Sequence, residues 1–186
     1  RPPRSTPKPS SAASDVYKRQ HLSPITVPIY AVIQGIFLGA ISYTFNSLYD
    51  GIVITAISYT LSILFVMLTL YRTGIIKPTE NFKLGVAAGT GGIALIYLAN
   101  FVMSFFGTGL SIMDINNASM YSIGFSLLVI VMASLNLVVD FDFIEEGSEK
   151  RAPKYMEWYG AFGLLVTLIW LYLEILRLLA KMNSRK

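Results

Sequence analysis

Cysteine is absent from the chain, and histidine occurs once, at His21. Without cysteine there can be no disulfide, no thiol catalysis and no thiolate metal site. A single histidine also excludes the multi-histidine zinc sites of zincin proteases, which need two histidines on one helix. The sequence therefore predicts neither a resident metal nor a cofactor.

Charged residues are also scarce: they make up 14% of the 186 residues, whereas 54% are hydrophobic. Soluble domains carry roughly 25% charged residues. The formal net charge is +4, and much of the basic excess lies near the two ends of the chain. This distribution favours a lipid environment and gives no indication of nucleic-acid binding.

Five long hydrophobic runs fill almost all of the chain after residue 24. A helix rises about 1.5 Å per residue and the hydrocarbon core is about 30 Å thick, so about 20 apolar residues make one crossing. The runs are apolar on every side, unlike the alternating strands of membrane barrels. We therefore predict an all-α, polytopic helical bundle, an integral membrane domain over residues 21–182, with spans at residues 27–45, 52–71, 84–106, 118–139 and 158–180.

The first 20 residues have a different composition, rich in proline, serine and basic residues and without hydrophobic periodicity. Such a composition predicts a disordered segment. Its last letters, VYKRQ, are similar to translated library-adapter sequence, so we interpret residues 1–20 as non-native and expect native sequence to begin near His21. At the other end, residues 183–186 form a basic tail.

Basic residues in the short loops predict the orientation, because lysine and arginine are retained on the cytoplasmic side. The second and fourth loops carry such residues, whereas the first and third carry none. We expect the second and fourth loops to be cytoplasmic and the C-terminus to lie on the other side. The basic residues from Lys181 to Lys186 argue against this orientation.

Glycines four residues apart occur in two of the spans, at Gly35 and Gly39 and at Gly85 and Gly89. Small residues let membrane helices approach closely, which substitutes for the missing hydrophobic drive. We interpret these glycines as helix-packing positions in preference to pore-lining or hinge positions.

Acidic residues within spans are the best candidates for function, because an ionised group at the bilayer centre costs about 2.5–3.5 kcal/mol on insertion scales. The first three spans contain none, which leaves Asp140 and Asp142 at the end of the fourth span and Glu174 in the fifth. If the fourth helix continues to a left-handed cap at Gly147, Asp140 lies about 10 Å inside its cytoplasmic end. We predict that Asp140 and Asp142 sense protons or cations.

Glu145 and Glu146 are possible secondary acidic groups at the same helix end. Carboxylates there oppose the helix macrodipole and one another. Either the basic residues of the fourth loop compensate them, or they take up protons easily. A solvated acidic loop is the alternative without a function.

Glu174 precedes Arg177 by one helical turn, which predicts an intrahelical ion pair. Arg177 and Lys181 are long enough to reach the interface with their charged ends. A structural role is therefore the simpler interpretation of Glu174.

The motifs of intramembrane enzymes are missing. There is no GxGD motif of aspartyl proteases, no serine and histidine pair within the spans, and no glycine-rich phosphate loop with its lysine. We do not expect an enzyme.

The segment LNLVVDFDFIEEGSEKRAPKYMEWYGAFGLLVTLIWLYLEILRLLAK, residues 135–181, resembles the C-terminal helix pair of the Bax inhibitor family in its bacterial branch. Residues 70–98 and 28–42 resemble the same branch. The resemblance implies a seven-helix membrane protein whose C-terminal helix is wrapped by the others, so the five spans correspond to the last five. It also implies a calcium leak with two aspartates on the last two helices as a proton-sensitive latch.

Only one of the two latch aspartates has a counterpart in this sequence: Asp140 falls at the first aspartate's place, whereas Thr167 falls near the second. Glu174 lies seven residues after Thr167, about 10 Å further across the membrane, and should not meet Asp140. The resemblance therefore predicts a pH-sensitive calcium or cation leak channel, with Asp140 at the cytoplasmic gate, in a bacterial inner membrane.

Two other functions stay open. The protein could be a non-conducting membrane scaffold that regulates membrane proteases or stress responses through lateral contacts with protein partners. A proton-coupled transporter would need a second ionisable group beside Asp140, and the sequence offers none clearly.

Overall fold

The computed structural model describes residues 22–115, 117 and 119–184. The predicted non-native segment 1–20, His21 and the last two residues of the basic tail lie outside these residues.

Five long helices form the described chain, and each is long and apolar enough to cross a membrane. They are α2 (Ser23–Leu48), α3 (Ile52–Arg72), α4 (Glu80–Phe105), α5 (Met120–Glu149) and α6 (Tyr155–Asn183), with a short 3-10 helix, η1 (Ser111–Met113), before α5. No strand occurs among the described residues. The prediction of an all-α membrane protein with five spans is confirmed.

Polar side chains and glycines set several of the helix ends. Thr79 and Ser119 cap the N-termini of α4 and α5, each accepting a hydrogen bond from a backbone N–H three residues later. Gly107 follows α4 with a φ of 72°, a left-handed conformation that glycine adopts without strain.

The predicted cap at Gly147 is wrong. Helix α5 continues to Glu149, and the residue with positive φ after it is Arg151, at 50°. An ion pair between Glu146 and Lys150, four residues apart, supports this extra turn. Asp140 consequently lies nine residues, or about 13 Å, before the end of the helix.

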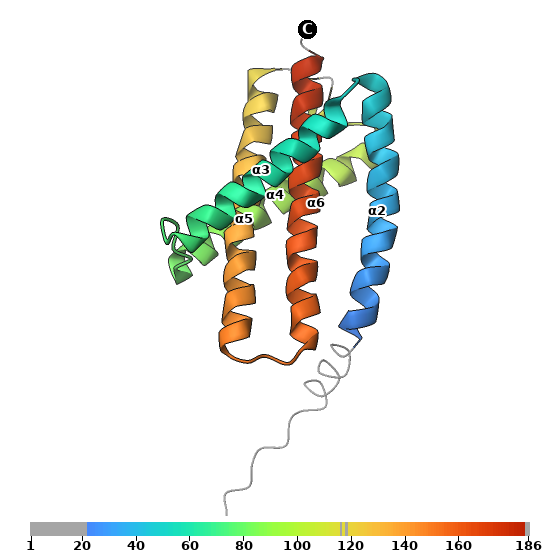
Figure 1. Ribbon diagram of the computed structural model, residues 1–186. Coiled ribbons are helices and arrows are strands. Elements are labelled where there is room, and N and C mark those ends of the chain that lie inside the picture. The colour runs from blue at the N-terminus through green and yellow to red at the C-terminus, as the bar shows by residue number, and fades with distance from the viewer. Residues whose placement is uncertain (1–21, 116, 118, 185–186) are drawn as a thin grey trace, which may run out of the picture.

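Helices α5 and α6 form an antiparallel pair joined by a short loop, and α6 lies between α5 and α2 (Figure 1). Helix α3 crosses over this pair at a steep angle, and α4 packs against α5. Leu137 of α5 and Leu171 and Leu176 of α6 are completely buried at the centre. The last helix is therefore the most enclosed element, and the boundary between α5 and α6, called the α5–α6 seam below, is the core of the bundle.

The outward faces of the helices remain strongly apolar. Ile36 on α2, Ile54 on α3 and Leu95 on α4 are each about 70% exposed. In water such a surface would drive aggregation, whereas lipid tails cover it without cost. The bundle is thus built for a bilayer environment.

Candidate functional site

Asp140 lies on the face of α5 that contacts α6. The Thr167 side chain of α6 lies close enough to its carboxylate to act on its charge. The Oδ2 atom is buried and has no hydrogen-bond partner among the described residues. Gly163 lies one turn before Thr167, and a Cβ atom on it would be in van der Waals contact with Asp140 Oδ1 at 3.4 Å, which places Asp140 against α6.

This environment leaves the carboxylate incompletely solvated. An ionised carboxylate removed from water needs several hydrogen bonds or a cationic partner, and Asp140 has one hydroxyl. A bound proton or a bound cation would each relieve that cost. That Asp140 senses protons or cations stays a prediction.

Asp142 has a cationic partner, unlike Asp140. Its Oδ2 atom lies 2.6 Å from the Nζ atom of Lys83 in the first turn of α4, and Lys83 also lies 3.4 Å from Glu80. For the acids of this helix end the sequence suggested basic partners in the fourth loop, whereas this ion pair joins α5 to α4. This contact could not be derived from sequence spacing, because residues 83 and 142 meet only through the packing of two helices.

The two other acids of this helix end are engaged as well. Glu145 accepts a hydrogen bond from the Tyr71 hydroxyl of α3, and Glu146 pairs with Lys150 on its own helix. Both glutamates are exposed. The acidic end of α5 is thus connected to α3 and α4, and the sensing role of these acids stays a prediction.

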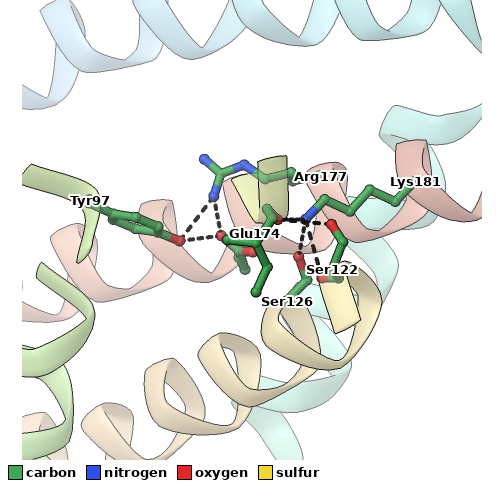
Figure 2. Close-up of polar contacts among 7 residues, drawn as sticks. Tyr97, Ser122, Ser126, Glu174, Arg177 and Lys181 are labelled. Carbon is green, nitrogen blue, oxygen red and sulfur yellow. Dashed lines mark hydrogen bonds and ion pairs between the residues drawn. The ribbon is translucent and has the colours of Figure 1, made fainter. Parts of the chain in front are cut away.

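Glu174 lies toward the other end of α6 in a second polar cluster (Figure 2). Its Oε2 atom accepts hydrogen bonds from Arg177 at 2.5 Å and from the Tyr97 hydroxyl of α4 at 2.7 Å. Arg177 also donates to the Tyr97 hydroxyl and stacks over the ring, 5.4 Å from its centre. The predicted pair of Glu174 and Arg177 is confirmed, and Tyr97 is a partner that the sequence did not reveal.

Lys181 does not extend toward the interface, so the expectation that it snorkels is wrong. Its side chain is 0% exposed. The ammonium group donates to the carbonyl oxygens of Ile112 and Ser122 at 3.0 and 3.3 Å, and to Ser126 Oγ at 3.0 Å (Figure 2). The loop containing η1 folds against the start of α5, and η1 and α5 together supply these acceptors next to the end of α6, which draws the amine inward.

The four glycines predicted to pack differ in their surroundings. A Cβ atom on Gly89 would collide with the end of the Met132 side chain of α5, so Gly89 lies at a close helix contact. Within the described part of the chain, nothing lies within 4 Å of such an atom on Gly35, Gly39 or Gly85, and their packing role stays a prediction.

The tightest glycine contact between α5 and α6 is at a residue that the sequence pattern did not single out. A Cβ atom on Gly160 would lie 2.9 Å from Ile144 Cγ1.

Among the residues that the structure describes, no group of three or more His, Cys, Asp or Glu side chains could hold a metal ion.

The family model described as Bax inhibitor 1 like matches residues 16–184. The chain belongs to the Bax inhibitor family. The match begins inside the segment 1–20 that we interpret as non-native. Neither the curated proteins nor the solved structures include a significant match to the chain.

Membership in the Bax inhibitor family bears on the pair formed by Asp140 and Thr167. The resemblance placed Asp140 and Thr167 at the two positions of an aspartate latch, and these two side chains face each other across the α5–α6 seam. The partner of Asp140 in this chain is a hydroxyl, which cannot ionise. Glu174 is the acid of α6 nearest to Thr167 in sequence, and its partners are Tyr97 and Arg177.

Proposed function

We propose that this Bax inhibitor family protein is a pH-sensitive cation leak channel of a bacterial inner membrane, and that Asp140 is its proton- and cation-responsive group. The observation that carries the proposal is the buried, unpartnered Oδ2 atom of Asp140 at the α5–α6 seam. Placing a carboxylate inside a membrane bundle beside a single hydroxyl costs free energy, and such a costly group usually marks a functional site.

The physical mechanism follows from the two charge states of Asp140. The protonated, neutral side chain fits the closed seam beside Thr167. The ionised side chain attracts water and a cation, and carboxylate oxygens are ligands that calcium prefers. Permeation through the seam is therefore expected to need the ionised form.

The acidic end of α5 also favours cations over anions. Of the acids within two turns of Asp140, Asp142 and Glu146 pair with lysines, whereas Glu145 has the uncharged Tyr71 as its partner and adds negative charge that attracts cations. In the orientation predicted from the loops, this mouth faces the cytoplasm.

Calcium flux into proteoliposomes that contain a trapped fluorescent indicator tests the proposal. For the full-length protein, we expect influx at pH 8 to exceed influx at pH 6 severalfold, because Asp140 loses its charge as the pH falls. Asp140→Asn should remove the pH dependence and reduce influx at pH 8 by about tenfold, which corresponds to about 1.4 kcal/mol.

Asp50→Asn is the matched control, because it makes the same substitution at an exposed position in the first loop. It should leave both rates unchanged. If Asp140→Asn retained the pH dependence of the natural protein, Asp140 would not be the responsive group.

A non-conducting scaffold is the second candidate, and the open glycine face of α2 favours it. Gly35 and Gly39 have nothing within 4 Å of their Cβ positions and could accept a helix of another membrane protein. Flux separates the two functions: a scaffold would give no influx at either pH.

A further inference from the structure

Lys181 is the largest completely buried side chain in the described bundle, and the leak mechanism proposed above does not use it. Burying an ammonium group is costly, and lysines near the end of a membrane helix usually extend to the headgroups. Lys181 lies in the last turn of α6, where such an extended conformation is within reach. Its inward direction therefore requires a specific reason.

The oxygens around the amine provide that reason. An ammonium group has three protons to donate, and three oxygens receive them: the carbonyls of Ile112 and Ser122 and the hydroxyl of Ser126. The Ile112 carbonyl also accepts from the Ser122 hydroxyl at 2.8 Å, which fixes η1 against α5. The two carbonyl acceptors are thus held in place without Lys181, by this hydrogen bond and by helix α5.

The neighbouring charges also favour a cation at this point. Glu174 and Asp114 are the acidic groups whose charges act on Lys181, and Arg177 is the basic one. Glu174 is 1% exposed, and its Oε1 atom is buried without a hydrogen-bond partner among the described residues.

We propose that the oxygens of Ile112, Ser122 and Ser126 form a binding site for a primary ammonium ion or a monovalent cation of similar size, and that Lys181 fills it as a tethered cation. A free cation approaching from this end of the bundle finds the site occupied. Lys181 consequently blocks the end of the α5–α6 seam that lies away from Asp140. The binding site stands independently, whereas the blocking role rests on the proposed leak function.

Chemical rescue of Lys181→Ala tests the binding site. The substitution removes three carbons and the amine, and n-propylammonium contains the same atoms. In the purified full-length protein in detergent, we expect the variant to have a lower Tm, and n-propylammonium at ten times its Kd to raise that Tm by about 3 °C. The neutral n-propanol should not raise it.

Lys150→Ala is the matched control, because Lys150 is exposed and pairs with Glu146 at the far end of α5. Its Tm should not respond to n-propylammonium, and neither should that of the natural protein. An equal gain from n-propanol, or an equal gain in Lys150→Ala, would overturn the cation site.

Ser126→Ala tests the site with Lys181 present, in case Lys181→Ala does not fold. Ser134→Ala on the same helix is its control, because the Ser134 hydroxyl donates to the Ile130 carbonyl of its own helix. We expect the Tm to fall several degrees more in Ser126→Ala than in Ser134→Ala. In a Lys181→Met background this difference should vanish, because the Ser126 hydroxyl then has no ammonium group to bind. Equal effects of the two serine variants would refute the site.

Thallium influx into proteoliposomes tests the blocking role. Lys181→Ala should conduct at least about threefold faster than the natural protein, and n-propylammonium should reverse the increase. Rescue of Tm without any flux, in either protein, would retain the cation site and overturn its blocking role together with the leak function. Flux in the natural protein without rescue of Lys181→Ala would overturn the cation site alone.

Discussion

Thr167 determines what kind of partner Asp140 has across the seam. A hydroxyl donates one hydrogen bond at any pH, so the protonation of Asp140 is not coupled to a second titrating group. Two carboxylates in the same place would share one proton and titrate as a pair. The identity of this one residue should therefore control how the stability of the bundle depends on pH.

Thr167→Asp should convert the seam into such a pair. Above about pH 4 the unfolded chain holds both aspartates ionised, whereas the folded pair retains a proton, so the folded state binds more protons and loses stability as the pH rises. We expect the Tm in detergent to fall by about 5 °C more than that of the natural protein between pH 5 and pH 8.

Thr167→Asn is the control, because it has nearly the same shape as aspartate and cannot ionise. Its Tm should follow the natural protein across this range. A Thr167→Asp profile parallel to that of Thr167→Asn would show that the two side chains do not share a proton.

Local spacing determined which side-chain contacts could be predicted. Glu174 and Arg177 lie on one helix face at a spacing of three, so their ion pair follows from helix geometry alone. In contrast, Asp142 pairs with Lys83 of α4, and Lys181 donates to oxygens of η1 and α5. These contacts depend on how separate helices pack, which spacing along one helix does not reveal. The sequence identified the candidate Asp140, but not the isolation of its Oδ2 atom.

At the scale of elements, the closest approach of α5 and α6 depends on Gly160. A larger residue there must displace Ile144 in a contact of 2.9 Å, and overpacking of this kind typically costs about 1–3 kcal/mol. Gly160→Leu should therefore lower the Tm by several degrees in a thermal melt monitored by circular dichroism.

Gly124→Leu serves as the comparison, because Gly124 lies on α5 with nothing within 4 Å of its Cβ position. It should leave the Tm unchanged or raise it slightly, since leucine is the better helix former. Adding Ile144→Ala to Gly160→Leu should recover part of the loss. Equal melting of the two glycine variants would show that the helices are not in close contact at Gly160.

Hydropathy located the helices well but not the full length of α5. The spans depend on apolar runs long enough to cross the bilayer, and these runs are explicit in the sequence. The polar stretch from Asp140 to Glu149 has no such signal, and it continues the helix through contacts with Tyr71, Lys83 and Lys150. The glycine spacing was a weaker guide, because a spacing of four does not say which face meets another helix.

At the scale of the whole molecule, the two polar regions lie toward opposite ends of the same pair of helices. Asp140 and its neighbouring acids lie near the loop between α5 and α6, whereas Lys181 lies where α6 ends beside the start of α5 (Figure 1). A leak path along the seam would pass both. The orientation of the bundle therefore decides which solution each region meets.

Single cysteines can establish that orientation, because the chain has no cysteine of its own. Thr73 and Ser148 are exposed near the loops predicted to be cytoplasmic, and Asp50 and Thr108 are exposed in the loops of the other side. In right-side-out spheroplasts, a membrane-impermeant maleimide should label cysteine at 50 and 108 but not at 73 and 148, and inverted vesicles should give the reverse. Labelling at 73 in spheroplasts would place the acidic end of α5 outside, where Asp140 would respond to external rather than cytoplasmic pH.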